Sequence, residues 1–204
     1  MVNVVKKSQA ASLADNVGAA SALFPPSQAQ AVHAQVQAHP QAHALAGREM
    51  SGSEIIVQIL ADEHVDTVFG YSGGAILPTY DAIFVFNQES AKAGRPQMPL
   101  IVPANEQGAG FMAAGYARAS GKVGVCLVTS GPGATNTVTP VRDCMADSIP
   151  IVVICGQVPT AAIGSDAFQE APVASLMGSV AKHIFLVTDA TKLDRAGPGL
   201  RRWG

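Results

Sequence analysis

The chain has 204 residues, of which 48% are hydrophobic and 14% charged, and its formal net charge is −2 at pH 7. This length suffices for one sizeable domain with additional segments, and the hydrophobic content favours a buried core over disorder. The near-neutral charge gives no electrostatic footprint for nucleic acid or an anionic membrane surface, and the apolar runs are far too short to span a bilayer. We therefore expect a globular protein with neither nucleic-acid nor membrane partners.

Residues 1–49 differ in composition from the rest of the chain. They are rich in Ala and Gln and contain almost no large apolar residues, so they cannot bury enough surface to offset the entropy of ordering. We predict a low-complexity, disordered tail. His33, His39 and His43 lack a tight ligand spacing, so no metal site is expected there. The segment is poor in acids but also in Arg, which leaves a plastid or other organelle address as the alternative to a cytoplasmic protein.

Residues 50–188 alternate regularly between two kinds of apolar pattern. Continuous apolar runs rather than alternating ones are typical of strands buried on both faces of a parallel sheet, and helical segments separate them. The expected fold class is α/β, with an open, doubly wound, mostly parallel sheet and helices on both faces. The predicted helices cover residues 51–65, 76–88, 106–120 and 133–148, and the predicted strands cover residues 66–71, 99–104, 123–131, 150–158 and 182–188.

The last segment, residues 189–204, breaks this pattern. It is rich in charges, Gly and Pro, and it contains no clear helix or strand. We predict an irregular tail, with a non-native sequence as one alternative. The three cysteines, Cys126, Cys144 and Cys155, form no C-x-x-C pair and are interpreted as buried free thiols in a reducing compartment.

The first glycine-rich turn, GYSGG at residues 70–74, fits the G-x-S-x-G pattern of a serine hydrolase. Ser72, Asp166 and His183 would supply the chain order Ser, Asp, His. However, one helix and one strand precede the turn, and no loop offers the oxyanion N–H group that such hydrolases need. The turn is better explained as a ligand-facing bend at the carboxyl end of a parallel strand.

Two further turns follow predicted strands. TSGPGATN, residues 129–136, opens a helix and could hold an anion, but it lacks the spacing of a dinucleotide fingerprint. Glu106 begins the helix after PAN, where a carboxylate is stabilised by the helix N-terminus by about 0.3–1 kcal/mol. Glu106 therefore has either that structural role or a role toward a ligand. All three turns are expected along one rim of the sheet.

Four stretches, taken in chain order, resemble the amino-terminal domain of acetolactate synthase (acetohydroxyacid synthase) large subunits. They are VDTVFGYSGGAILPTYDA, NEQGAGFMAAGYARASGKVGVCLVTSGPGATNTVTP, ADSIPIVVICGQVP and IGSDAFQEAPV, and the resemblance covers roughly residues 50–188. It implies the pyrimidine-binding domain of a thiamine-diphosphate enzyme. The implied activity condenses two pyruvates, or pyruvate with 2-ketobutyrate, in isoleucine and valine biosynthesis. Alternatives are another thiamine-diphosphate carboligase or oxidase, and a non-catalytic remnant that dimerises with or regulates a full-length synthase.

The resemblance also implies roles for individual residues. Glu106 would act as a catalytic proton relay to N1′ of the cofactor's aminopyrimidine, with its pKa raised by desolvation in an apolar cleft. Gln169 would donate a hydrogen bond to a developing oxygen on the substrate. The implied cofactor-binding residues are Tyr71, Ser72, Gly73, Glu106, Pro132 and Asn136, and the implied substrate-side residues are Gly74, Phe168 and Gln169.

This sequence departs from the family pattern in several ways. Asn105 stands where His is usual and cannot supply a proton near neutral pH, and Ser72 replaces the commoner Pro. In the family, FAD and Mg²⁺ are bound by further domains that do not follow here, so we expect a truncated or frame-shifted chain that is inactive alone. The resemblance implies a homodimer, 2-ketoacid substrates and an association with a small regulatory subunit.

Overall fold

The structure is a computed structural model that describes Leu45 and residues 48–188. Contacts along the chain divide it into two units, Met1–Glu49 and Met50–Gly204, and the elements below all belong to the second. The predicted tail over residues 1–49 lies almost wholly outside the described residues. The predicted irregular segment, residues 189–204, also lies outside them.

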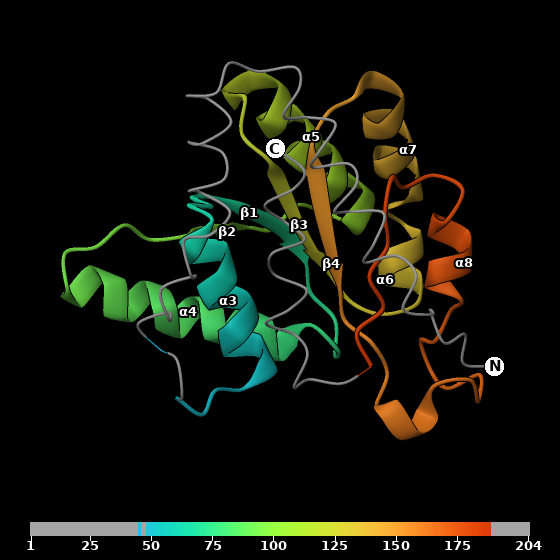
Figure 1. Cartoon of the computed structure of the whole chain (residues 1–204), viewed down its shortest axis with the longest axis horizontal. Coiled ribbons are helices and arrows are strands. Elements are labelled where there is room, and N and C mark those ends of the chain that lie inside the picture. The colour runs from blue at the N-terminus through green and yellow to red at the C-terminus, as the bar shows by residue number, and fades with distance from the viewer. Residues whose placement is uncertain (1–44, 46–47, 189–204) are drawn as a thin grey trace, which may run out of the picture. The chain divides into compact units, whose positions relative to one another are not determined.

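The described residues form a four-stranded sheet with helices on both faces (Figure 1). The strand order is β2-β1-β3-β4, and every neighbouring pair is parallel. This arrangement confirms the predicted α/β class. In chain order the elements are α3 Gly52–Asp62, β1 Val68–Tyr71, α4 Leu77–Lys92, β2 Leu100–Ile101, α5 Glu106–Ser120, β3 Gly124–Val128, α6 Pro132–Thr135, α7 Val138–Asp147, β4 Ile151–Cys155, the 3₁₀ turn η1 Thr160–Ala162, and α8 Val173–Met177.

The predicted single helix over residues 133–148 is wrong in one respect, because the structure divides it into α6 and α7. Pro140 explains the division. In a continuous helix its ring would collide with the carbonyl of residue 136, and it has no N–H to donate. The chain instead turns at Thr137, whose hydroxyl donates to the carbonyl oxygen of Ala134 at 2.6 Å. Pro140 then falls in the first turn of α7, where a proline is tolerated.

The predicted strand over residues 182–188 is also wrong. These residues have no regular secondary structure, and the sheet of the described residues ends at β4. Phe185 and Leu186 are 54% and 62% exposed, so this apolar run neither pairs nor packs as a strand. His183 instead places its ring against that of Phe185, with the two centroids 4.3 Å apart.

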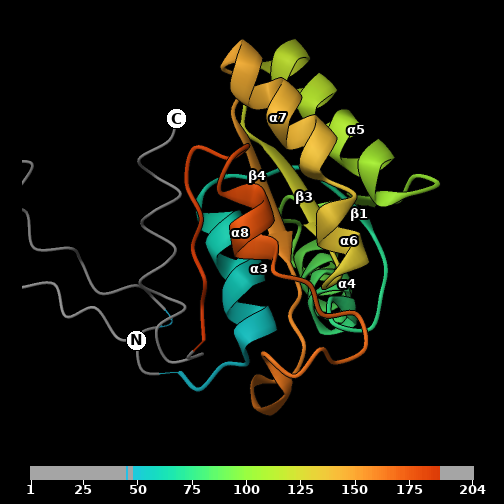
Figure 2. The ribbon, with the colours of Figure 1, turned by 90° about the vertical axis from the view of Figure 1, so that its right-hand side faces the viewer.

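Each face of the sheet carries its own apolar cluster. One cluster joins α3 and α4 to the sheet through residues such as Leu60, Val68 and Leu127. The other joins α5 to the opposite face through residues such as Phe69 and Cys126. Figure 2 shows α3 on one side of the strands and α5 with α7 on the other. Neighbouring residues along β1 and β3 therefore belong to different clusters, as the alternation of side chains along a strand requires.

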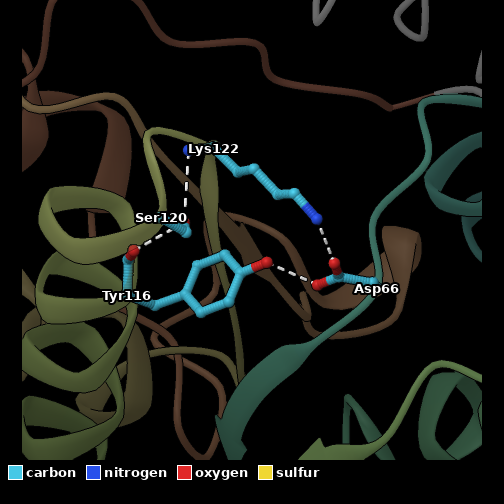
Figure 3. Close-up of polar contacts among 4 residues, drawn as sticks. All are labelled: Asp66, Tyr116, Ser120 and Lys122. Atoms are coloured by element: carbon cyan, nitrogen blue, oxygen red, sulfur yellow. Dashed lines mark hydrogen bonds and ion pairs between the residues drawn. The ribbon is translucent and has the colours of Figure 1, made fainter.

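A polar network ties the far end of α5 to the start of β1 (Figure 3). The Tyr116 hydroxyl donates to one carboxylate oxygen of Asp66, and Lys122 forms an ion pair with the other. The Ser120 hydroxyl donates to the carbonyl of Tyr116 at 2.7 Å. The hydrogen bond from Lys122, followed by that from Tyr116, lowers the pKa of Asp66. The bond to Asp66 in turn raises the pKa of Tyr116. The network fixes this end of α5 near the amino-terminal end of β1, whereas the three turns lie beyond the carboxyl ends of the strands.

Helix α5 packs its backbone directly against β3 because small residues form the contact. A Cβ added to Gly124 would lie 2.7 Å from the carbonyl carbon of Ala113, and still closer to its oxygen. The α5 residues that face the sheet are fully or nearly fully buried alanines, namely Ala109, Ala113, Ala114 and Ala117. Their size sets the distance between helix and sheet.

We predict that Gly124→Ala destabilises the protein by about 1–3 kcal/mol, because the added methyl group collides with backbone that cannot move independently. Gly115→Ala, on the helix α5 that packs against Gly124, is the control, since a Cβ there meets nothing within 4 Å. It should be neutral or stabilise by about 0.5–1 kcal/mol. Urea unfolding of both variants measures the difference, and equal stabilities would contradict the packing argument.

Candidate active site

The order of the strands creates a position where ligands commonly bind. The chain leaves β1 through α4 and reaches β2 on one side, whereas it leaves β3 through α6 and α7 and reaches β4 on the other. The ends of β1 and β3 are aligned, since Tyr71 pairs with Val128. In open α/β sheets, ligands bind outside the carboxyl ends of strands at such a reversal. The glycine-rich turns after β1 and β3 meet here.

Thr129 joins these two turns. It follows β3 directly, is 3% exposed, and its hydroxyl oxygen accepts the backbone N–H of Ala75 at 3.3 Å. A Cβ added to Gly73 would lie 2.5 Å from the Thr129 side chain, and one added to Gly133 would lie 2.6 Å from its methyl group. The turns after β1 and β3 therefore both pack around this one side chain. Thr129 was predicted to lie at the start of the second glycine-rich turn, within the predicted strand 123–131, but no role was predicted for it.

Glu106 is the first residue of α5 and lies beside Gly133, which packs against Thr129. The helix is capped by Asn105, whose side-chain oxygen accepts the N–H of Gly108 at 2.7 Å. Asn105 thus has a structural role of its own at the position where the resembled family has His. Asn136, at the end of α6, donates from Nδ2 to Oε2 of Glu106 at 3.0 Å. The structure therefore brings together Glu106 and Asn136, which are 30 residues apart in sequence.

The surroundings of Glu106 are more polar than sequence analysis expected. Its side chain is half-buried and hydrogen-bonded, rather than enclosed by apolar groups. A small polar cleft of about 230 Å³ lies next to it, lined by Asn105, Gln107, Thr135, Asn136 and Thr139. Glu106 is thus held by a hydrogen bond beside a polar cleft.

Buried protonated groups lie beneath this carboxylate. Burial, then the neighbouring Cys155, then Glu106 raise the pKa of Cys126 to about 12, and burial raises the pKa of Cys155 to about 11. Burial also raises the pKa of Tyr80, whose hydroxyl donates to the Leu127 carbonyl at 3.1 Å. Cys126, Cys144 and Cys155 are free thiols, as predicted, although Cys155 is only partly buried. The two thiols in the strands are unreactive at neutral pH because they are protonated.

A second cleft, of about 370 Å³, lies beyond the ends of β1, β3 and β4. Gly74, Ser130, Gln157, Phe168 and Gln169 contribute to its lining. The Gln157 side-chain oxygen accepts the N–H of Val158 at 2.8 Å, which orients its amide group. Gln157, which comes two residues after β4, was not among the predicted site residues.

The predicted site residues fall into two groups, one beside each cleft. Glu106 and Asn136 belong to the polar side, whereas Gly74, Phe168 and Gln169 share the second cleft. The remaining predicted residues lie along the turns. Tyr71 ends β1, Gly73 packs against Thr129, and Ser72 and Pro132 are exposed.

Comparison with known proteins identifies the class. Residues 50–177 match the family model described as thiamine pyrophosphate enzyme, N-terminal TPP binding domain. Because this match covers more than half of the chain, the chain belongs to that family. None of the helices in the described part of the chain is long and apolar enough to cross a membrane.

The relatives that match are mostly acetolactate synthases, as the resemblance predicted. The chain is 53% identical over 144 residues to the mitochondrial acetolactate synthase catalytic subunit of Saccharomyces cerevisiae, which covers 71% of this chain and 20% of the yeast protein. It is 47% identical over 146 residues to the acetolactate synthase isozyme 2 large subunit of Escherichia coli, covering 72% of this chain and 25% of that subunit. The chain thus spans a fifth to a quarter of these relatives.

We predict that Thr129→Val weakens folding by about 0.5–1.5 kcal/mol, because valine keeps the shape of threonine but cannot accept the N–H of Ala75. Thr139→Val, at an exposed position of α7, is the control and should change stability by less than about 0.5 kcal/mol. Urea unfolding curves provide the measurement. A Thr129→Val protein as stable as the control would show that the hydroxyl does not join the turns.

Proposed function

We propose that this chain supplies the aminopyrimidine-binding part of a thiamine-diphosphate site in a protein with acetolactate synthase activity. The observation that carries the proposal is the Glu106 carboxylate, which begins α5, accepts from Asn136 at 3.0 Å and lies beside the reversal of strand order. The family match and the acetolactate synthase relatives support it.

The residues present fit the aminopyrimidine end of that cofactor. A Cβ added to Gly133 would lie 3.6 Å from Oε1 of Glu106, so the turn after β3 passes directly beside this carboxylate oxygen. Glu106 can exchange a proton with a ring nitrogen, and Asn136 can orient the carboxylate. Tyr71, Ser72 and Gly73, in the turn after β1, and Pro132, in the turn after β3, would supply further contacts to the cofactor.

When bound, thiamine diphosphate would supply an electron sink that lets a 2-ketoacid lose carbon dioxide and join a second 2-ketoacid. The chain's own residues would then do two things. Glu106 would hold a proton at Oε1, the oxygen that Asn136 does not bond, and pass it to the cofactor ring, while the hydrogen bond from Asn136 to Oε2 orients the carboxyl group. Gln169 would donate from its amide to an oxygen of the substrate, in the cleft that it shares with Phe168 and Gly74.

The proposal for the whole protein goes further. It would condense two pyruvates, or pyruvate with 2-ketobutyrate, on the path to isoleucine and valine, and it would use FAD and Mg²⁺ outside the described residues. We propose a homodimer that also associates with a small regulatory subunit. A cytoplasmic location stays a prediction. The yeast relative is a mitochondrial protein.

We predict that Glu106→Gln weakens thiamine-diphosphate binding to this chain about tenfold or more, since a charge-assisted hydrogen bond is worth about 1.5–3 kcal/mol. Glu89→Gln, at an exposed position on α4, makes the same change of charge elsewhere and should bind like the wild type. Isothermal titration calorimetry with thiamine diphosphate and Mg²⁺ measures both. Equal affinities for the two variants, or no binding by the wild type at millimolar cofactor, would contradict the proposal.

We also predict that the 204-residue chain forms no measurable acetolactate from pyruvate when thiamine diphosphate, Mg²⁺ and FAD are added. The reason is that the described residues supply the aminopyrimidine side of the proposed site, and the resembled family completes it with a domain of another subunit. A colorimetric assay of acetoin after acid treatment detects the product. Steady turnover would show that the chain is an enzyme by itself.

A further inference from the structure

The segment between η1 and α8 is closed by one carboxylate. Oε1 of Glu170 accepts the backbone N–H of Gly164 at 2.5 Å, and Oε2 accepts that of Ala167 at 3.1 Å. The backbone N–H of Glu170 in turn donates to the carbonyl of Ala167 at 2.9 Å. These bonds close a loop of residues 164–170, which we call the Glu170 loop. Two of them, to Gly164 and Ala167, join the Glu170 side chain to the loop backbone.

The backbone of the Glu170 loop has a left-handed conformation at several residues. Gly164, Asp166 and Gln169 all have positive φ, at 84°, 55° and 59°. For Asp166 and Gln169 this left-handed conformation is unfavourable, so it persists only where other interactions enforce it. The Phe168 side chain is 88% exposed and contributes little burial to hold the loop. Ser165 donates from its N–H and hydroxyl to the Ala162 carbonyl at the start of the loop, and the bonds to Glu170 are the hydrogen bonds that span the loop itself.

The loop carries two residues of the proposed site, Phe168 and Gln169. The backbone of Gln169 lies directly against Gly131, since a Cβ added to Gly131 would be 2.6 Å from the Gln169 carbonyl carbon. Gly131 belongs to the turn after β3, which packs around Thr129. Gln169 is thus located by the β3 turn on one side and by the Glu170 loop on the other.

We propose that Glu170 is a positioning residue, whose carboxylate holds the Glu170 loop so that Gln169 and Phe168 line the 370 Å³ cleft. This inference deepens the proposed function and rests on it. The backbone N–H groups, that of Gly164 first, lower the pKa of Glu170, as expected of an ionised acceptor. The ligand facing these residues would be the 2-ketoacid, whose carboxylate and ketone oxygens both accept hydrogen bonds from an amide.

Three variants test this role. Glu170→Ala removes both side-chain bonds, and Glu170→Gln keeps one acceptor oxygen. Asp166→Asn makes the same change of charge within the loop without altering the carboxylate of Glu170. In an isotope-labelled chain, Glu170→Ala should speed amide hydrogen exchange at Gly164 and Ala167 about tenfold or more. Glu170→Gln should give a smaller increase, Asp166→Asn none, and the amide of Leu127 in β3 should not change in any variant.

Ligand titrations connect the loop to the site. In the wild type, pyruvate should shift the side-chain amide signal of Gln169, and thiamine diphosphate with Mg²⁺ should shift that of Asn136. Glu170→Ala should lose the Gln169 response and keep the Asn136 response, and Glu170→Gln should regain part of the Gln169 response. A loss that a general destabilisation caused would affect both signals.

The outcomes separate the two proposals. Unchanged exchange at Gly164 and Ala167 in Glu170→Ala, or the same exchange in Asp166→Asn, would overturn the positioning role. A loosened loop with an unaltered pyruvate response at Gln169 would also overturn it. If Asn136 ignores thiamine diphosphate in the wild type, the proposed function fails, whereas the exchange data still decide whether Glu170 holds the loop. If only Gln169 ignores pyruvate there, the assignment of the cleft to a 2-ketoacid is wrong.

Discussion

The close contact between α5 and the sheet determines where the site lies. Alanines on the buried face of the helix, and Gly124 opposite Ala113, allow the helix to approach the strands closely. Because α5 is a single helix of 15 residues, a contact near its middle also places its first residue, Glu106. The Asp66 network fixes the other end of the helix. The position of the proposed catalytic carboxylate is thus set mainly by packing that lies away from it.

The turns beyond the strands depend on a second contact, at Thr129. This side chain is buried between the turns after β1 and β3, and it accepts a hydrogen bond from Ala75. A residue with both a hydroxyl and a methyl group suits this place, because the hydroxyl satisfies a backbone donor while the methyl group packs against two glycines. Because Thr129 directly follows β3, its contacts fix the two turns relative to that strand.

Much of this fold could be predicted from the sequence, because buried parallel strands leave continuous apolar runs. The same signal failed at residues 182–188, since an apolar run shows that a segment could pair but not that a partner strand is present. Pro140 is a sequence signal for the division between α6 and α7. However, the effect of a proline depends on how many residues precede it in the helix. Glu106, Asn136 and Gln169 were proposed from a resemblance, not from spacing. That Asn136 reaches Glu106 is a contact between segments distant in sequence, which no local pattern reports.

The G-P-G sequence at residues 131–133 links the two halves of the proposed site. Gly131 has φ of 50°, and its missing side chain makes room for the backbone of Gln169. Gly133 makes room on the other side, next to Thr129 and the Glu106 carboxylate. Pro132 between them begins α6 and fixes its own φ, so the two glycines keep a defined separation. The distance between Glu106 and Gln169, at the two ends of the proposed site, is therefore set in large part by three consecutive residues.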